Sequence, residues 1–229
     1  MSRGERIGHG TRAVHAGLPA AADGAPFLPG PTFAAPFHLA GAAVPEGYGR
    51  YANPTFTRYE EALGELEGGA ALSFASGMAA TSAVLLATLE AGDVFVAPGD
   101  AYPGVRRIAE EHLRPRGVDV RLVPSDAGAF RAALAGATLV WVETPSNPGL
   151  EAIDLAALAP AVHAAGARLV VDNTLATPYL QRPLELGADL VVASGAKALT
   201  GHSDLIIGHV AAPDAEALAP FLDWRGLHG

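Results

Sequence analysis

The sequence predicts an α/β protein with a three-layer architecture around a mostly parallel β-sheet. Half of the 229 residues are hydrophobic, 17% are charged and only 7% are aromatic, so a core must be assembled mainly from Ala, Val and Leu. From residue 57 onward, short apolar runs alternate with helical stretches, which is the pattern of βαβ units. Near-continuous apolar runs of this kind are typical of strands buried on both faces.

Residues 1–56 contain no sustained periodicity and many prolines and glycines, which interrupt helices and strands. A stretch this long without regular elements is typical of a disordered tail or of an arm that lies on another surface. The low charge favours an arm that docks, and so do five aromatic side chains: Phe27, Phe33, Phe37, Tyr48 and Tyr51.

The remaining residues, 57–229, are expected to form the large domain. Thr57 is expected to cap a first helix, which would end at Gly68. Seven apolar runs then predict strands at 70–75, 94–97, 118–123, 139–143, 169–172, 190–193 and 205–211. Helices are expected at 78–89, 104–113, 127–134, 155–165 and 215–222.

Composition argues against several classes of protein. A net charge of −9 argues against a general nucleic-acid binder, which would present a basic face. The absence of cysteine excludes disulfides and thiolate zinc sites, and the eight histidines show no metal-binding spacing. Residues 70–89 are uncharged and long enough to span a membrane, but the serines and threonines among them favour strand, turn and helix. The polar N-terminus lacks a secretory signal pattern, so a soluble, cytoplasmic protein without a membrane partner is expected.

Lys197 is the only lysine, and every other long basic side chain is arginine. A guanidinium stays protonated at any ordinary pH, whereas a partly buried ammonium can lose its proton and become a nucleophilic amine. Codon usage that disfavours lysine is the plain alternative. The residues around Lys197 favour the chemical interpretation.

Polar residues follow the ends of several predicted strands, where open α/β sheets bind their ligands. Ser76, Gly77 and Met78 stand between a strand and a helix, so their backbone N–H groups could hold a phosphate. Tyr102 could present its ring to a planar ligand, and Asp172 ends another strand. Each has a plain alternative: a simple turn, a packed loop tyrosine and a helix-capping aspartate. Glu143 and Asn147, around another strand end, are well placed for a ligand oxygen.

A lysine amine, a strand-end carboxylate, an aromatic ring and a helix N-terminus are together the groups that a pyridoxal phosphate site needs. The amine would form the Schiff base, and the carboxylate would keep the pyridine nitrogen protonated. The aromatic ring would stack on the cofactor, and the helix start would hold its phosphate.

Five stretches carry a closer resemblance: Tyr48-Gly-Arg50-Tyr-Ala-Asn53-Pro54-Thr55, Ser76-Gly77-Met78, Glu143-Thr-Pro-Ser-Asn147-Pro148, residues 171–194 and Lys197 with Gly201-His202-Ser203-Asp204. On these stretches the sequence resembles the Cys/Met-metabolism (trans-sulfuration) family of pyridoxal-phosphate enzymes, which have the aspartate-aminotransferase fold (fold type I). The resemblance extends from near the N-terminus to about residue 210. Its run from Asp172 to Asp204 is far more specific than any single short motif.

The resemblance implies a role for each matching residue. Lys197 would be the Schiff-base lysine and the proton shuttle, and Tyr102 would stack on the ring and assist proton transfer. Asp172 would pair with the pyridine nitrogen, and Asn147 would lie near the phenolic oxygen of the ring. The phosphate would be held by Gly77, Met78 and Ser194.

The resemblance also implies an assembly. Tyr48 and Arg50 would reach the phosphate in the neighbouring subunit, so the arm of residues 1–56 would cross a dimer interface. The family is typically a dimer of such dimers.

Two departures from the family pattern stand out. The family usually has a threonine immediately before the lysine as a phosphate ligand, and this chain has Ala196. The loss of that hydroxyl should weaken cofactor binding by about 1.5–3 kcal/mol unless another group replaces it. The family also continues into a smaller C-terminal domain with an arginine that clamps the substrate carboxylate, and nothing in this sequence matches that domain.

The implied activity is cleavage of the C–S bond of cystathionine or related substrates by γ- or β-elimination. The residues after Lys197 are most like those of chains called cystathionine γ-lyase. The alternative reaction is γ-replacement, as in a cystathionine γ-synthase or an O-acyl-homoserine sulfhydrylase. An alternative of another class is a truncated, non-catalytic remnant that binds the cofactor without turnover.

Overall fold

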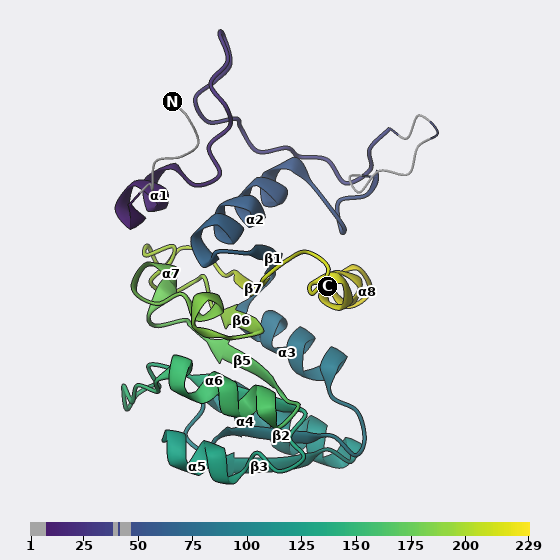
Figure 1. Cartoon of the computed structure of the whole chain (residues 1–229). Coiled ribbons are helices and arrows are strands. Elements are labelled where there is room, and N and C mark those ends of the chain that lie inside the picture. The colour runs from purple at the N-terminus through teal and green to yellow at the C-terminus, as the bar shows by residue number, and fades with distance from the viewer. Residues whose placement is uncertain (1–7, 39–40, 42–46) are drawn as a thin grey trace.

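The computed structural model describes residues 8–38, 41 and 47–229, and its centre is a seven-stranded sheet (Figure 1). The order of the strands is β1-β7-β6-β5-β4-β2-β3. β7 pairs antiparallel with β1 and β6, and the pairs among β2 to β6 are parallel. The strands are β1 (Ala70–Phe74), β2 (Val94–Pro98), β3 (Asp119–Val123), β4 (Leu139–Glu143), β5 (Arg168–Asp172), β6 (Leu190–Ala193) and β7 (Gly208–Ala212). The expected mostly parallel α/β sheet is confirmed.

The start of β7 is the largest error among the predicted strands. The prediction began at residue 205, but Leu205 and Ile206 are exposed and precede the strand. Hydrophobicity alone cannot separate them from the strand, because residues 205–207 are as apolar as Val210 and Ala211 of the strand. A close backbone approach marks the true start, since a β-carbon on Gly208 would lie 2.4 Å from the Ser76 carbonyl oxygen.

The first long helix, α2 (Pro54–Glu67), begins earlier than predicted. Asn53 caps it by accepting a hydrogen bond from the Thr55 N–H at 2.9 Å, and Pro54 occupies the first turn, where its missing N–H costs nothing. The prediction that Thr57 is the cap is therefore wrong. The predicted stop is confirmed, because Gly68 ends α2 with a φ of 87°.

The N-terminal stretch also contains a short helix, α1 (His9–His15), which the sequence did not predict. α1 packs beside α2 and α7 (Thr177–Leu180), but none of its residues is buried, so no apolar face marks it in the sequence. Residues 1–7, 39–40 and 42–46 of the expected arm, including the first residues of the polar N-terminus, lie outside the described residues.

The other main helices are α3 (Gly77–Thr88), α4 (Pro103–Ile108), α5 (Ala127–Ala132), α6 (Leu155–Ala164) and α8 (Ala219–His228). α4 continues through a π-helical turn, Ala109–Leu113, so the predicted helix at 104–113 is present as two joined parts. The predicted helix at 215–222 corresponds to α8, which begins four residues later, at Ala219, and ends at His228. α3 and α8 lie to one side of the sheet in Figure 1, and α6 and α7 lie to the other.

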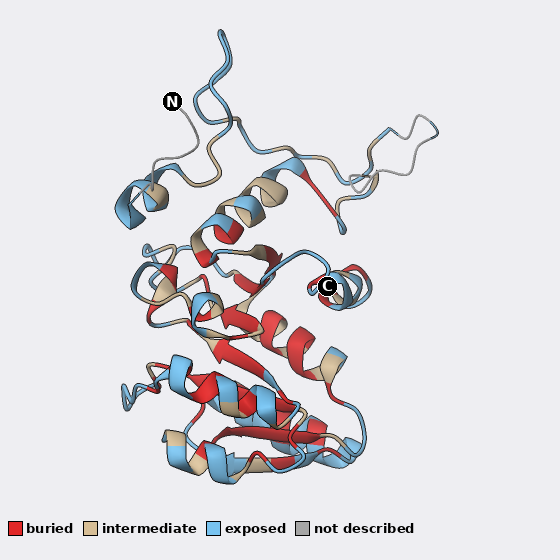
Figure 2. Cartoon of the chain, in the orientation of Figure 1, coloured by how far each residue is buried: buried red, intermediate tan, exposed pale blue. Residues whose placement is uncertain are grey.

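Alternating strand residues supply two separate cores. Phe95, Trp141 and Val170 pack toward α3 and α4, whereas Val140 and Leu169 belong to the cluster with α5 and α6. Figure 2 shows the buried residues concentrated in the central strands and along α3. Burial on both sheet faces explains the continuous apolar runs and makes a three-layer fold. Trp141 is fully buried.

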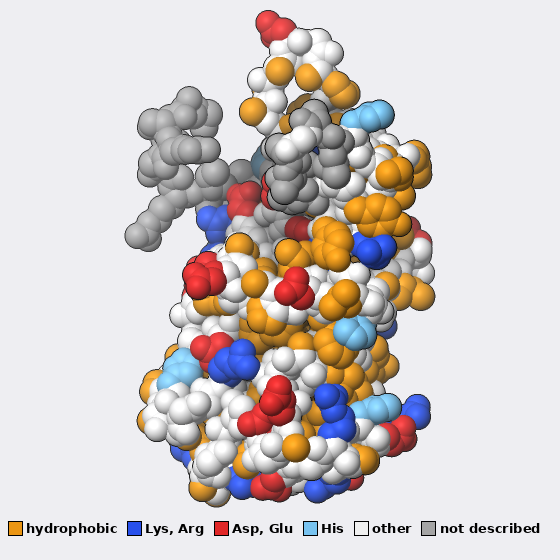
Figure 3. All heavy atoms as spheres, turned by 90° about the vertical axis from the view of Figure 1, so that its right-hand side faces the viewer, with side chains coloured by type: hydrophobic (Ala, Val, Ile, Leu, Met, Phe, Trp, Pro, Cys, Tyr) orange, Lys and Arg blue, Asp and Glu red, His pale blue; other side chains and the backbone are white. Residues whose placement is uncertain are grey.

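Buried Arg225 ties α8 to the rest of the domain. Its guanidinium donates to the Ser73 carbonyl oxygen at 2.9 Å and the Tyr51 carbonyl oxygen at 3.0 Å, and it pairs with the Glu60 carboxylate. These bonds join α8, β1, α2 and the segment before α2. Figure 3 shows the α8 side of the molecule, where hydrophobic side chains gather across the middle and charged ones of both signs toward the lower end.

The uncharged stretch at 70–89 divides into β1 and α3. Among the described residues, no helix combines the length and the apolarity needed to cross a bilayer.

Candidate active site

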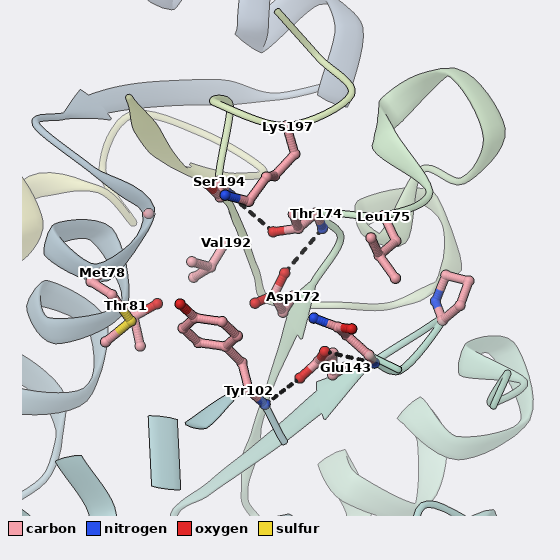
Figure 4. Close-up of a pocket in the computed structure, with 13 residues that line it drawn as sticks. Met78, Thr81, Tyr102, Glu143, Asp172, Thr174, Leu175, Val192, Ser194 and Lys197 are labelled. Atoms are coloured by element: carbon pink, nitrogen blue, oxygen red, sulfur yellow. Dashed lines mark hydrogen bonds between the residues drawn. The ribbon is translucent and has the colours of Figure 1, made fainter. Parts of the chain in front are cut away.

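A cavity of about 330 Å³ opens where β4, β5 and β6 end and α3 begins. Side chains from four strand ends converge on it (Figure 4). Of the residues predicted for the site, it is lined by Gly77, Met78, Tyr102, Glu143, Asn147, Asp172, Ser194 and Lys197. Tyr48 and Arg50 are not among its lining residues.

The start of α3 forms one wall of the cavity. Ser76 caps the helix, and its Oγ accepts a hydrogen bond from the Ala79 N–H at 3.0 Å. The first N–H groups of a helix have no acceptor within it, so those of Gly77 and Met78 point outward for an anion. The helix dipole adds partial positive charge at the same place.

Ser194 stands directly against this helix start. A β-carbon on Gly77 would lie 2.7 Å from the Ser194 Cβ and 3.1 Å from its Oγ. Glycine is therefore required for the close approach of α3 to the end of β6. The approach places a serine hydroxyl beside the N–H groups of Gly77 and Met78.

Asp172 ends β5 and faces the cavity. Its Oδ1 accepts a hydrogen bond from the Thr174 N–H at 3.0 Å, and the Thr174 Oγ1 accepts one from the Ser194 N–H at 2.9 Å. These bonds connect the ends of β5 and β6. The helix-capping alternative does not apply, because α7 begins only at Thr177. Burial raises the pKa of Asp172, and the hydrogen bonds from Thr174 oppose that rise.

Tyr102 forms the opposite wall. It precedes α4, is 45% exposed, and points its ring into the cavity (Figure 4). Its backbone N–H donates to the Glu143 Oε2 at 2.8 Å, so the backbone is anchored while the ring remains accessible.

Glu143 is the last residue of β4 and lines the cavity, and its expected contact with a ligand oxygen stays a prediction. Its second oxygen, Oε1, accepts from the Asn147 N–H at 3.0 Å, so both oxygens bond backbone N–H groups. The β4–β5 register pairs Glu143 with Asp172, another carboxyl. Burial raises the pKa of Glu143 to about 7; its two backbone hydrogen bonds oppose the rise, and the charges of Asp172 and Asp100 add to it.

Lys197 enters the cavity from the loop after β6. Its N–H donates to the Ser194 carbonyl oxygen at 3.2 Å, a tight turn that directs the side chain back over the strand end. Ala196 does not line the main cavity. It lines a separate surface hollow with Leu205, Ile206 and Lys197, which lines both.

Sequence reasoning missed two threonines of the cavity, Thr81 and Thr174. Thr174 directly follows Asp172 and Asn173 and could have been included with them. Thr81 lies three residues after Met78 on α3, and therefore on the same helix face. Helical spacing was the signal that could have identified Thr81.

Tyr48 and Arg50 lie on the α8 side of the chain. The Arg50 Nε donates to the Gly226 carbonyl oxygen at 3.1 Å, and its guanidinium lies 4.6 Å from the centre of the Tyr48 ring. Both residues are exposed, and Tyr48 retains 42% of its surface.

The groups around the cavity fit pyridoxal phosphate. The α3 N–H groups and the Ser194 hydroxyl match a phosphate, Asp172 matches a protonated ring nitrogen, and the Tyr102 ring offers a stacking face. Lys197 supplies the only lysine amine. The cavity volume falls within the usual range for sites of small molecules and cofactors, about 300–1,000 Å³.

Two relatives of this chain carry the names of enzymes that act on or form cystathionine. A Streptomyces coelicolor protein, provisionally named a cystathionine gamma-lyase, is 53% identical over 97% of this chain and 58% of its own length. A Mycobacterium bovis cystathionine gamma-synthase is 42% identical over 93% of this chain and 58% of its own length. The chain thus spans less than two thirds of the length of these relatives.

A solved structure agrees with them in fold. The cystathionine gamma-synthase of Xanthomonas oryzae pv. oryzae, crystallised with aminoacrylate and cysteine, superposes with a TM-score of 0.90 at 36% identity. The match covers 97% of this chain and 59% of that one. The sequence profile of the family described as Cys/Met metabolism PLP-dependent enzyme matches residues 32–224. Because that match covers most of the chain, the protein belongs to the Cys/Met metabolism family of pyridoxal-phosphate-dependent enzymes.

Proposed function

We propose that this chain provides the cofactor site of a lyase that cleaves the C–S bond of cystathionine or a related sulfur amino acid by γ- or β-elimination. One observation carries the proposal: Lys197, Asp172 and Tyr102 face a single cavity beside the N-terminus of α3. When bound there, pyridoxal phosphate supplies an electron sink for the carbanion formed at the substrate α-carbon.

The phosphate would be held by the Gly77 and Met78 N–H groups and the Ser194 hydroxyl. Two contacts hold this cradle in place: the Ser194 N–H donates to the Thr174 Oγ1, and Ser194 packs against Gly77. A carboxylate oxygen of Asp172 would accept a hydrogen bond from the protonated ring nitrogen. A protonated ring nitrogen would oppose the effect of burial on the Asp172 pKa, since an adjacent cation favours the ionised carboxylate.

Tyr102 would stack on one face of the cofactor ring, and Asn147 would donate toward its phenolic oxygen. Lys197 Nζ would bind the cofactor, take the α-proton of the substrate as an amine, and return a proton to a later carbon. Tyr102 would assist that transfer through its hydroxyl. These roles use groups from three loops, which follow β2, β4 and β6.

The arm and assembly form a second part of the proposal. Tyr48 and Arg50 would complete the phosphate site of a neighbouring subunit, within a dimer of dimers. Their exposed position outside the chain's own cavity supports this role, as do the exposed rings of Phe27 and Phe33 on the arm. Free sulfur amino acids are the substrates proposed here, and we place the enzyme with them in the cytoplasm.

γ-Replacement is the alternative reaction, and the likeness to two cystathionine gamma-synthases favours it. A sulfhydrylase that uses an O-acyl-homoserine belongs to the same alternative. Cofactor binding without turnover is the third possibility, because the chain spans about 58% of the relatives it matches.

A turnover assay separates the three. Purified chain with pyridoxal phosphate is incubated either with cystathionine or with an O-acyl-homoserine plus cysteine. We expect 2-oxo acid and ammonia to be released from cystathionine by the parent and not by Lys197→Ala. Cystathionine formed from the second mixture would instead support replacement, and a cofactor-loaded protein inactive in both would support the non-catalytic alternative.

A further inference from the structure

Glu143 connects the two loops that carry Tyr102 and Asn147. Its Oε2 accepts from the Tyr102 N–H at 2.8 Å, and its Oε1 accepts from the Asn147 N–H at 3.0 Å. Tyr102 follows β2 and Asn147 follows β4, two strands that pair in the sheet. One carboxylate therefore connects the Tyr102 loop and the Asn147 loop, which both contribute to the cavity wall.

The cost of placing a carboxylate here is high. Glu143 is only 5% exposed, and its neighbour across the β4–β5 pairing is Asp172. In the part of the chain that the structure describes, no basic side chain forms an ion pair with Glu143. Buried charges are normally paired, so this one must be retained by its hydrogen bonds or by a function.

The two N–H bonds explain why a carboxylate is needed. An ionised carboxylate only accepts, so each of its oxygens can bond one N–H group. A glutamine of the same shape has one accepting oxygen, and its NH₂ group would face the other N–H. α4 adds a second reason, because Tyr102 precedes it without a side-chain capping bond, so the bond from its N–H to Glu143 adds to those that its carbonyl oxygen makes with α4.

We propose that Glu143 is a positioning residue of this site, which holds the stacking ring of Tyr102 and the Asn147 side chain at a fixed separation through their backbone N–H groups. The inference rests on the proposed function for its consequence, but the contacts themselves exist without cofactor. A positioning role is assigned to Glu143 because each of its oxygens accepts a hydrogen bond from a backbone N–H group.

Protonation of Glu143 would weaken this arrangement. A carboxylic acid carries a hydroxyl on one oxygen, and that oxygen becomes a poor acceptor for an N–H group. The charged groups that act on Glu143 are Asp172 from β5 and Asp100 from the loop after β2. Both carboxylates oppose ionisation of Glu143.

Hydrogen–deuterium exchange of the cofactor-free chain tests the contacts directly. We expect the Tyr102 or the Asn147 amide to exchange at least about tenfold faster in Glu143→Gln than in the parent, since a hydrogen bond to a charged group is lost. The matched control is Glu151→Gln, which changes an exposed carboxylate in the same loop and should leave both amides unchanged. Unchanged exchange of both amides in a folded Glu143→Gln would overturn the proposal.

Two further readouts complete the test. In the parent, protection of both amides, corrected for intrinsic exchange, should rise as pH is raised through about 7, and this rise should be absent from Glu143→Gln. If Glu143→Gln does not fold, a pH-independent protection in the parent would overturn the inference. With pyridoxal phosphate, Glu143→Gln should weaken binding and reduce the circular dichroism of the bound ring, while Glu151→Gln should not. A parent that binds no cofactor contradicts the proposed function, whereas the exchange result still decides the role of Glu143.

Discussion

Gly77 and Ser194 are in contact across the start of α3 and the end of β6, with no room for a β-carbon between them. The Cβ of an alanine at residue 77 would lie 2.7 Å from the Ser194 Cβ. The proposed phosphate ligands lie at this contact: they are the N–H groups at the start of α3 and the Ser194 hydroxyl. A single glycine thus couples the packing of two elements to the proposed cofactor cradle.

Gly77→Ala should separate these elements. Overpacking costs about 1–3 kcal/mol in the free energy of unfolding, and displacement of the phosphate ligands should weaken pyridoxal phosphate binding by about tenfold or more. Urea unfolding and a cofactor titration measure the two effects. Gly30→Ala is the control, because no atom lies within 4 Å of its new β-carbon. Equal cofactor affinity in the Gly77 and Gly30 variants would contradict the proposed cradle.

Asp172→Asn should keep the local turn and remove the charge. The asparagine oxygen can still accept from the Thr174 N–H, so the fold should persist, but a neutral amide cannot stabilise a protonated ring nitrogen. We expect weaker cofactor binding and a loss of turnover of at least about a hundredfold. Asp204→Asn, on the exposed loop after Lys197, is the control. Full activity in Asp172→Asn would remove Asp172 from the mechanism.

The cofactor-free chain should gain stability as the pH falls from about 7 toward 5. The folded-state pKa of Glu143 is raised from 4.5 to about 7, and that of Asp172 is also raised. Between pH 4.5 and about 7 the Glu143 side chain binds more protons in the folded state than in the unfolded state. Its contribution to the free energy of unfolding is therefore complete below the unfolded pKa and is lost as pH rises through the folded pKa. Urea midpoints measured across this window should change less in Glu143→Gln. A slope identical to that of the parent would show that Glu143 does not titrate there.

Arg225→Met should destabilise the domain by about 3 kcal/mol, because it leaves the half-buried Glu60 carboxylate without its cation and two carbonyl oxygens without their donor. α8 would lose its anchor to β1 and to the segment before α2. Arg114→Met, which removes an exposed ion pair with Glu110, should hardly move the urea midpoint. Comparable midpoints for both variants would show that the Arg225 contacts contribute little to stability.

The sheet and most of the cavity could be predicted because both follow from strand ends. Strands buried on both faces appear as apolar runs, and parallel strands bring the polar residues that follow them to one edge. Tyr102, Asp172 and Lys197 are brought together in this way. The identity of the cofactor needed the combination of these residues, since each had a plain structural alternative.

Other features depend on contacts that one sequence does not reveal. The partners of Glu143 are backbone N–H groups, which leave no mark in the residue pattern, so its position alone suggested a ligand contact. Asn53 and Thr57 are both good helix caps. Pro54 favours a start after Asn53, and so do contacts with the preceding segment, because the Asn53 side chain also donates to the Thr32 and Ala34 carbonyl oxygens. Leu205 and Ile206 continue the apolar run of β7 without entering the sheet.

The central claim is that Lys197 carries the cofactor, and the most direct measurement is the near-visible absorbance of the purified chain with pyridoxal phosphate, followed by borohydride reduction and peptide mass mapping. Lys197→Ala is measured beside it. We expect a lysine-bound cofactor band in the parent only, with the reduced cofactor attached to the peptide that contains Lys197. No band in a folded parent, or a cofactor attached elsewhere, would contradict it.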